Sequence, residues 1–289
     1  MKIIFFICCF FLSFFVSAQR GNINLISEYE DTLKILAERI VYEELEENRR
    51  VANDAFMTHL DEVLQYEKSF DYNFDSLKTI SVENSPDNQF RIFTWMLRKS
   101  NGTYEYYGRV QLKKKRGIKI YNLIDNSMNI RSPEKKVLDQ NNWYGGIIYE
   151  IIYIKFSRKK LYTILLWDGN DYYSTKKIID VMQFNGDNIS FGKPIFKDYD
   201  SNNTRIILEH EGKTSISMKY NKEMQKIVFN HLVPKSKELE GLYEYYIPDG
   251  TFNAFNFKKG NWFFEEDIDI RNKNKNIEYK EPDLGLTPK

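Results

Sequence analysis

Cysteine is almost absent from this sequence. The 289 residues include two cysteines, Cys8 and Cys9, and both lie in the first apolar segment. The rest of the chain therefore has no disulfide, no thiolate nucleophile and no cysteine-based zinc or iron–sulfur site. The hydrophobic core must stabilise the fold without covalent cross-links.

Glycine, proline and an excess of one charge are also lacking. The chain has 14 glycines and 7 prolines, which excludes collagen-like and low-complexity proteins. Its 42 basic residues balance 41 acidic ones, for a net charge of +1. Because no basic surplus attracts phosphates, the composition predicts a globular protein without a nucleic-acid partner.

The first 18 residues have the pattern of an export signal. Lys2 supplies the positive charge, residues 3–16 are almost wholly apolar, and Val16 and Ala18 are small residues at the cleavage positions. This stretch is shorter than the roughly 20 residues that span a bilayer, and no later segment is longer. We expect cleavage between Ala18 and Gln19, export to the bacterial periplasm or medium, and no membrane span in the mature chain.

Residues 26–70 contain no glycine or proline and are rich in helix-forming residues. Their apolar residues recur at helical spacing in two stripes, namely Tyr29, Leu33, Leu36 and Ile40, and then Ala52, Phe56, Leu60, Val63 and Leu64. The charged stretch 43–50 fits a solvated turn, with the break near residues 46–53. The sequence predicts a helical hairpin over residues 19–70.

After residue 70 the apolar period changes to two, as in Ile216, Met218 and Tyr220. Turn signals recur about every 11 to 15 residues, which is too short for crossover helices between parallel strands. We expect an α+β fold, in which the hairpin is followed by a large antiparallel β-meander over residues 71–271. A sandwich or open barrel is favoured over a propeller, because no motif repeats at a propeller period.

Three further segments after residue 70 have a predicted place in the fold. Residues 147–156 are almost continuously apolar, so we expect a central strand covered on both faces. Residues 131–142, which include Pro133, are polar and are expected to be a loop that divides the stranded region. Residues 272–289 are expected to form a polar C-terminal tail.

One loop has the spacing of a calcium site. Asp198, Asp200, Asn202 and Glu209 occupy the EF-hand ligand positions. However, Arg205 places a positive charge inside this loop and the flanking residues predict strands, which favours a plain hairpin turn.

No HExxH, GxSxG or glycine-rich phosphate motif is present, so the sequence identifies no catalytic residue and indicates no cofactor, which favours a protein without catalytic activity. A carboxylate pair for glycoside cleavage stays an alternative, because the 41 acidic residues offer many pairs.

Two segments place tryptophan beside glycine. These are residues 143–146 (WYGG) and 167–170 (WDGN). Such loops stack on sugars and bind their hydroxyls, although a core tryptophan next to a tight turn is the plainer alternative. If the protein has a ligand site, we expect it to include Trp143, Trp167, Asp168, Asn170 and Asp171, with exposed polar groups. The tyrosine doublets 106–107, 172–173 and 245–246 are expected to place one ring on each face of a strand.

The sequence is similar to a family of exported bacterial proteins with no assigned function. The similarity rests on residues 74–80 (FDSLKTI), 85–88 (SPDN), 90–95 (FRIFTW), 143–145 (WYG), 167–170 (WDGN) and 176–179 (KKII). The resemblance implies export and a shared fold, and it implies no substrate.

These observations favour an exported, non-catalytic binding or interaction protein whose partner is a polar ligand or an envelope protein. Two alternatives stay open, a carbohydrate-binding or carbohydrate-cleaving protein and a structural envelope protein that binds its partner through the hairpin. An open cleft with unpaired carboxylates would favour the first alternative. An exposed apolar stripe on the helices would favour the second.

Overall fold

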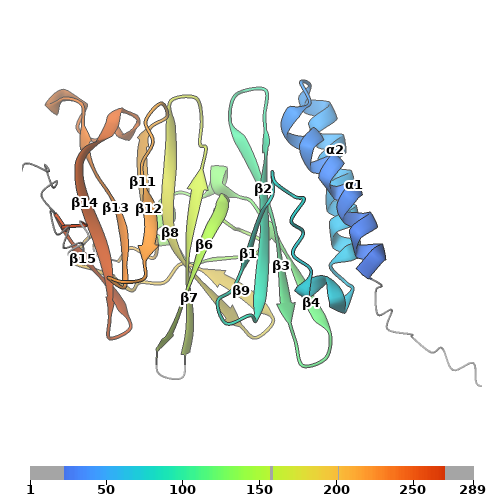
Figure 1. Ribbon diagram of the computed structural model, residues 1–289. Helices are drawn as coiled ribbons and strands as arrows, with labels where there is room; N and C mark the ends of the chain where they lie inside the picture. Colours follow the sequence, from blue (N-terminus) through green and yellow to red (C-terminus); the bar gives the residue numbers. More distant parts are fainter. Residues whose placement is uncertain (1–22, 157–158, 201, 271–289) are drawn as a thin grey trace, which may run out of the picture.

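The computed structural model describes residues 23–156, 159–200 and 202–270. The expected signal peptide and the polar tail at 272–289 lie outside these residues. The described chain forms two α-helices followed by fifteen strands in three sheets, none closed into a barrel, which confirms the predicted α+β class (Figure 1). None of its helices combines the length and the apolar character needed to cross a membrane.

The two helices form the predicted hairpin, α1 (Ile23–Tyr42) and α2 (Glu46–Val63). The turn lies at residues 43–45, earlier than expected, and most of the charged stretch belongs to α2. Acidic side chains in the first turn of α2 favour a helix start there. The buried Arg49 donates to the backbone carbonyls of Glu43 (2.7 Å) and Glu44 (2.8 Å), which satisfies groups in the turn.

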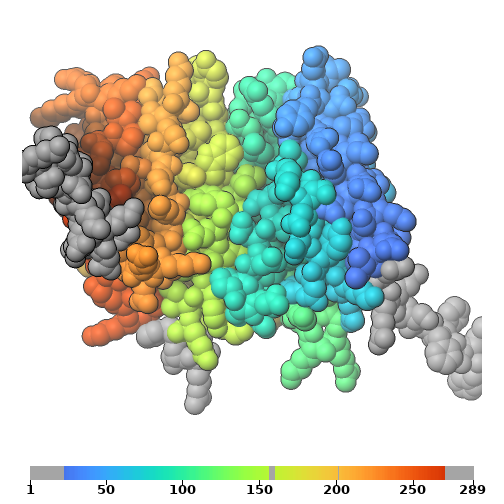
Figure 2. Space-filling view, viewed as in Figure 1, coloured from blue at the N-terminus to red at the C-terminus, as the bar shows by residue number. Residues whose placement is uncertain are grey.

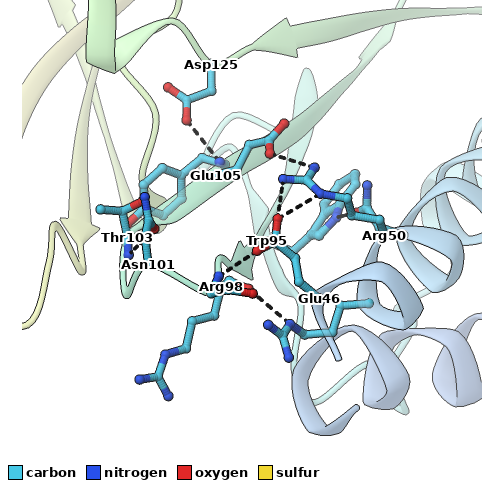
Figure 3. Close-up of polar contacts among 12 residues, drawn as sticks. Glu46, Arg50, Trp95, Arg98, Asn101, Thr103, Glu105 and Asp125 are labelled. Carbon is cyan, nitrogen blue, oxygen red and sulfur yellow. Dashed lines mark hydrogen bonds and ion pairs between the residues drawn. The ribbon is translucent and has the colours of Figure 1, made fainter. Parts of the chain in front are cut away.

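Helix α2 is tied to the hairpin of β2 (Phe90–Arg98) and β3 (Tyr104–Lys113) by charged groups (Figure 3). The Glu46 carboxylate accepts from the backbone amide of Ser100 (2.6 Å) and pairs with Arg50 (2.8 Å). Arg50 also pairs with Glu105 on β3 (3.0 Å). The helix is therefore fixed against one end of the first sheet.

The sheets follow one another along the chain. The first has the order β1-β2-β3-β4, with β1 (Ser81–Asn84) and β4 (Ile118–Ile124). The second has the order β5-β9-β8-β7-β6, with β11 also paired to β8, and comprises β5 (Leu138–Asp139), β6 (Ile147–Phe156), β7 (Lys159–Asp168), β8 (Ser174–Asn185), β9 (Asn188–Phe191) and β11 (Ile206–Glu211). The third has the order β10-β15-β14-β13-β12, with β10 (Phe196–Lys197), β12 (Met218–Asn221), β13 (Lys226–Pro234), β14 (Tyr246–Lys258) and β15 (Asn261–Glu265). All these pairings are antiparallel except β10 with β15.

The hairpin and the three sheets stack in chain order as four layers (Figures 1 and 2). Alternate residues of one strand serve different cores. On β2, Ile92 packs toward the second sheet, whereas Phe93 packs toward the helices. On β8, Ile178 packs toward the first sheet and Ile179 toward the third. The assembly is therefore a layered sandwich, in which the first and second sheets are covered on both faces.

Strand β6 differs in part from its prediction. Its side chains Ile148 and Ile152 enter different cores, so both faces are covered as expected. However, β6 ends the ladder of its sheet instead of occupying the centre. Two hydroxyl groups of the first sheet form hydrogen bonds with this edge. The Ile148 amide donates to Thr94 Oγ1 (3.0 Å), and the Ile148 carbonyl oxygen accepts from Ser81 Oγ (2.5 Å). The apolar run thus belongs to an edge strand buried between layers.

The polar segment 131–142 follows the first sheet along the chain, but it is not only a loop, because Leu138–Asp139 form β5 of the second sheet. The change from the second to the third sheet is less simple than a single boundary. The chain enters the third sheet at β10, returns to the second at β11, and enters the third again at β12. The loop between β10 and β11 therefore crosses from one sheet to another.

Candidate functional site

Four of the five predicted site residues lie at the end of β7, with Trp167 and Asp168 as its last two residues and Asn170 and Asp171 in the loop that follows. Asp168 is only 7% exposed, and its Oδ1 accepts hydrogen bonds from the Tyr106 hydroxyl (2.7 Å) and the Asn170 amide (2.8 Å). The Tyr106 hydroxyl accepts in turn from the Gly169 amide (2.7 Å). Burial and then the Asp168 charge raise the pKa of Tyr106, which keeps it a donor. The expectation that Asp168 is exposed was wrong, because this carboxylate holds the loop together.

The two tryptophan–glycine segments meet at this point. Ile147, directly after the first segment, pairs with Trp167 of the second. A Cβ atom at Gly146 would lie 3.2 Å from the Trp167 carbonyl oxygen, and one at Gly145 would lie 2.7 Å from Asp125 Oδ1. Asp125 is itself fixed, because its carboxylate accepts from the backbone of β3 (Figure 3). Close packing of the backbone accounts for both glycines.

The two tryptophans have different surroundings. Trp143 is fully buried and packs against Phe191, with ring centroids 6.4 Å apart. It belongs to the core between the first and second sheets, which is the plainer alternative of the sequence analysis. Trp167 is half-buried and meets Tyr104 edge-on at 6.2 Å.

The remaining residues of the loop reach β11. Asn170 has a left-handed backbone (φ 47°), donates to Ser174 Oγ (2.7 Å) and accepts from Lys176 Nζ (2.8 Å). Asp171 accepts from the Ser174 amide at 3.0 Å. Ser174 Oγ then donates to the Glu209 carboxylate at 2.5 Å. The predicted loop and the last residue of the calcium-like spacing are thus joined in one hydrogen-bond network.

The calcium-like spacing does not form a metal site in the described residues. Asp198, Asp200 and Asn202 lie in the exposed loop that crosses between sheets, so the expected hairpin turn was wrong. Glu209 lies on β11, opposite Lys176 of β8. Nowhere in the described chain do three acidic, histidine or cysteine side chains converge as metal ligands.

Three adjoining cavities form a groove over β11. Their volumes are about 550, 440 and 390 Å³. Glu209 lines all three, and Tyr199, Ile207 and Tyr243 line the first two. The short helix η5 (Tyr243–Tyr245) contacts β11 and β8 on one side of the groove. We refer to these three cavities together as the β11 groove.

Tyrosines and carboxylates dominate the lining of the β11 groove. The tyrosines are Tyr144, Tyr173, Tyr199, Tyr243, Tyr245 and Tyr246. The carboxylates are Glu134, Asp171, Asp198, Asp200, Glu209, Glu244 and Glu266. The lining therefore offers aromatic faces for stacking and oxygen atoms that accept hydrogen bonds.

The pKa values of two lining tyrosines reflect this environment. Burial, and next the charges of Asp168 and Glu209, raise the pKa of Tyr144. Burial, followed by Tyr243 and Asp200, raises the pKa of Tyr199. Both phenols stay protonated and are able to donate a hydrogen bond to a ligand.

Histidines contribute little to this chemistry. His231 lines the second cavity, and its Nδ1 lies 2.8 Å from Asp249 Oδ2. His210 is buried on β11 with Nε2 3.0 Å from Thr175 Oγ1, and burial lowers its pKa. His59 lies on α2, in a different layer. No zinc set is assembled from them among the described residues.

The sequence analysis named part of this site. Four residues named there line the β11 groove, namely Asp171, Asp198, Asp200 and Glu209. Tyr199, Tyr243 and Glu134 were not named as site residues. The tyrosine doublets were the available signal, but they were expected on strand faces. Tyr172 and Tyr173 instead lie in the loop before β8 and are 73% and 70% exposed.

Comparison of the chain with protein-family models, curated proteins and solved structures finds no match.

Proposed function

We propose that the protein is an exported binding protein that holds a polar ligand in the β11 groove. The observation that supports this most is that three cavities share Glu209 and that each of them is lined by at least two tyrosines. Concave sites with a few convergent polar groups and aromatic walls are the usual form of ligand sites. The resemblance to exported proteins and the signal-like residues 1–18 support the location.

Tyr199 and Tyr243, the two tyrosines that line both the first and the second cavity, provide a test of this proposal. Tyr243 is 54% exposed, so its truncation should change stability little. Tyr199 is 44% exposed but packs edge-on against Phe255 and Phe264, so its truncation should also lower stability. We expect both Tyr199→Ala and Tyr243→Ala to lose affinity for the ligand in calorimetric titrations, with the melting temperature of Tyr243→Ala near that of wild type.

Tyr172→Ala is the matched control, because Tyr172 is 73% exposed and does not line the three cavities. Affinity that is unchanged in both groove variants, or lost equally in the control, would refute the assignment of the groove.

A carbohydrate ligand is a second candidate, favoured by the exposed tyrosine rings, which stack on sugar faces. Binding of a neutral oligosaccharide that is lost in Tyr243→Ala would establish it.

An interaction role for the helical hairpin is a third candidate. Four large apolar side chains near its turn are exposed, Ile35 at 60%, Tyr42 at 73%, Leu45 at 64% and Val51 at 58%. This is the exposed apolar surface expected of a partner-binding hairpin. Cross-linking to envelope proteins that is lost in Ile35→Ser/Tyr42→Ser would support this role, and unchanged cross-linking would contradict it.

A further inference from the structure

The β11 groove is far more acidic than the chain that builds it. The whole sequence has a net charge of +1, whereas the lining includes seven carboxylates and one lysine, Lys176. Low-dielectric walls concentrate the field of such groups inside a cleft. The ligand therefore experiences a negative potential that the overall composition does not reveal.

Among the described residues, most of these carboxylates have no cation as a partner. Glu209 is the one that pairs with Lys176, and the distance is a long 3.9 Å. In the same part of the chain, the carboxylates of Glu134, Asp200, Glu244 and Glu266 take part in no ion pair and no hydrogen bond. The groove thus contains acceptors that a cationic ligand would satisfy without displacing an internal partner.

The first cavity also has an independent feature, a buried side-chain oxygen that lacks a hydrogen-bond donor. Asn203 lines this cavity and is only 5% exposed, yet its Oδ1 accepts no hydrogen bond from the described residues. A buried carbonyl oxygen without a donor costs free energy. A ligand N–H group would remove this cost.

The same lining favours an organic cation over a metal ion. Among the described residues, no three acidic or histidine side chains converge as a metal site would require. The lining instead combines tyrosine rings with carboxylates, and aromatic faces attract ammonium and guanidinium groups.

We propose that the β11 groove binds an organic cation with more than one ammonium or guanidinium group. This inference rests on the proposed function and names its ligand class. Because the three cavities adjoin one another through Glu209, the ligand is extended, with charged groups along its length. A lysine- or arginine-containing peptide and a polyamine share this chemistry.

Calorimetric titration of the whole mature chain separates the ligand classes. The probes are tetralysine, tetralysine acetylated at every side-chain amine, spermine, a neutral oligosaccharide and Ca²⁺. We expect tetralysine or spermine to bind, and acetylation to weaken the peptide about tenfold or more, since each screened ion pair contributes a few-fold. Preference for the peptide over spermine, or the reverse, identifies the source of the cation.

A charge-matched pair of variants places the binding site. Glu134→Gln/Asp200→Asn removes two unpaired groove carboxylates, and we expect about fivefold weaker binding of the cationic probe. Glu28→Gln/Asp31→Asn removes the same residue types from the exposed face of α1 and should change affinity less than about twofold. Equal effects of the two pairs would overturn the inference.

The outcomes also separate this inference from the proposed function. Equal binding of the acetylated and free peptides, or preference for the sugar or Ca²⁺, overturns the cationic ligand. If that binding is still lost in Tyr199→Ala and Tyr243→Ala, the β11 groove remains the binding site. If none of the five probes binds, both proposals fail.

Discussion

The buried ion pair between Arg205 and Asp180 links the core of the second sheet to the wall of the β11 groove. Arg205 is 0% exposed and Asp180 is 2% exposed, with Nε and Oδ2 2.9 Å apart. The Arg205 guanidinium also donates to the carbonyl oxygens of Pro133 and Lys136, the latter at 2.9 Å. Pro133 and its neighbour Glu134 line the groove. Arg205 should therefore support both stability and the position of this wall.

The expected change in the free energy of unfolding depends on which buried charge each variant leaves without a partner. Arg205→Met leaves the Asp180 carboxylate buried without its cation, and Asp180→Leu leaves the guanidinium without its anion. Each should cost about 3–5 kcal/mol. The double variant buries no charge. It loses the hydrogen bonds to the two carbonyl oxygens and the one that the Val181 amide donates to Asp180, which together should cost about 1–3 kcal/mol. The coupling energy should therefore be at least about 3 kcal/mol.

Urea unfolding followed by circular dichroism gives the four free energies of this cycle. Hydrogen exchange of the amides of residues 134–136 adds a second measurement, because the double variant should exchange faster there even though its stability is largely restored. If a single variant does not fold, recovery of a cooperative transition in the double variant carries the same information. Additivity of the two single effects within about 0.5 kcal/mol would refute the reasoning.

Other positions provide simpler tests. Asp168→Ala should lower the free energy of unfolding by about 1–3 kcal/mol, because the buried Tyr106 hydroxyl loses its acceptor; a neutral result in urea unfolding would contradict the network. Burial and the charge of Glu150 raise the pKa of Glu83 from 4.5 to about 7, so the folded chain binds this proton more tightly than the unfolded chain. Stability should therefore fall as pH rises between these values, by about 1 kcal/mol after solvent screening, and Glu83→Gln should flatten the profile; equal profiles would refute this. EDTA should leave the melting temperature unchanged, and a decrease that Ca²⁺ reverses would contradict the assignment of the loop at Asp198. Intact-mass analysis of the exported protein should give Gln19 as the first residue, and a chain beginning at Met1 would refute cleavage there.

The helical hairpin was predictable because its stabilising contacts repeat locally. Leu33 and Ile40, and then Phe56 and Leu60, recur at helical spacing and are all buried. The position of the turn was not predictable in the same way. The side chain of Arg49 reaches back to two turn carbonyls and across to the Arg98 carbonyl (3.0 Å) on β2. Hydrogen bonds from one side chain to distant backbone carbonyls do not produce a periodic pattern in the sequence.

The strands were predictable, but their layers were not. A strand with apolar residues on both faces indicates that both faces are covered, and Ile92 and Phe93 of β2 show this pattern. The pattern does not tell which layer covers each face. For β6 this ambiguity produced the wrong position, because a central strand and an edge strand buried between sheets have the same apolar sequence.

The β11 groove escaped prediction because of how the chain crosses between sheets. After β10 the chain returns to the second sheet, where β11 pairs with β8 from Ile206↔Ile179 to Glu211↔Ser174. This crossing puts the loop at Asp198 at one side of the groove and Glu209 on its floor. The spacing that resembles a calcium loop therefore has a different physical origin. Acidic residues are favourable in the crossing loop because it is solvated, and Glu209 alternates with the buried Leu208 and His210 on its strand. These residues become a common site only when η5, from a distant part of the chain, packs against β11.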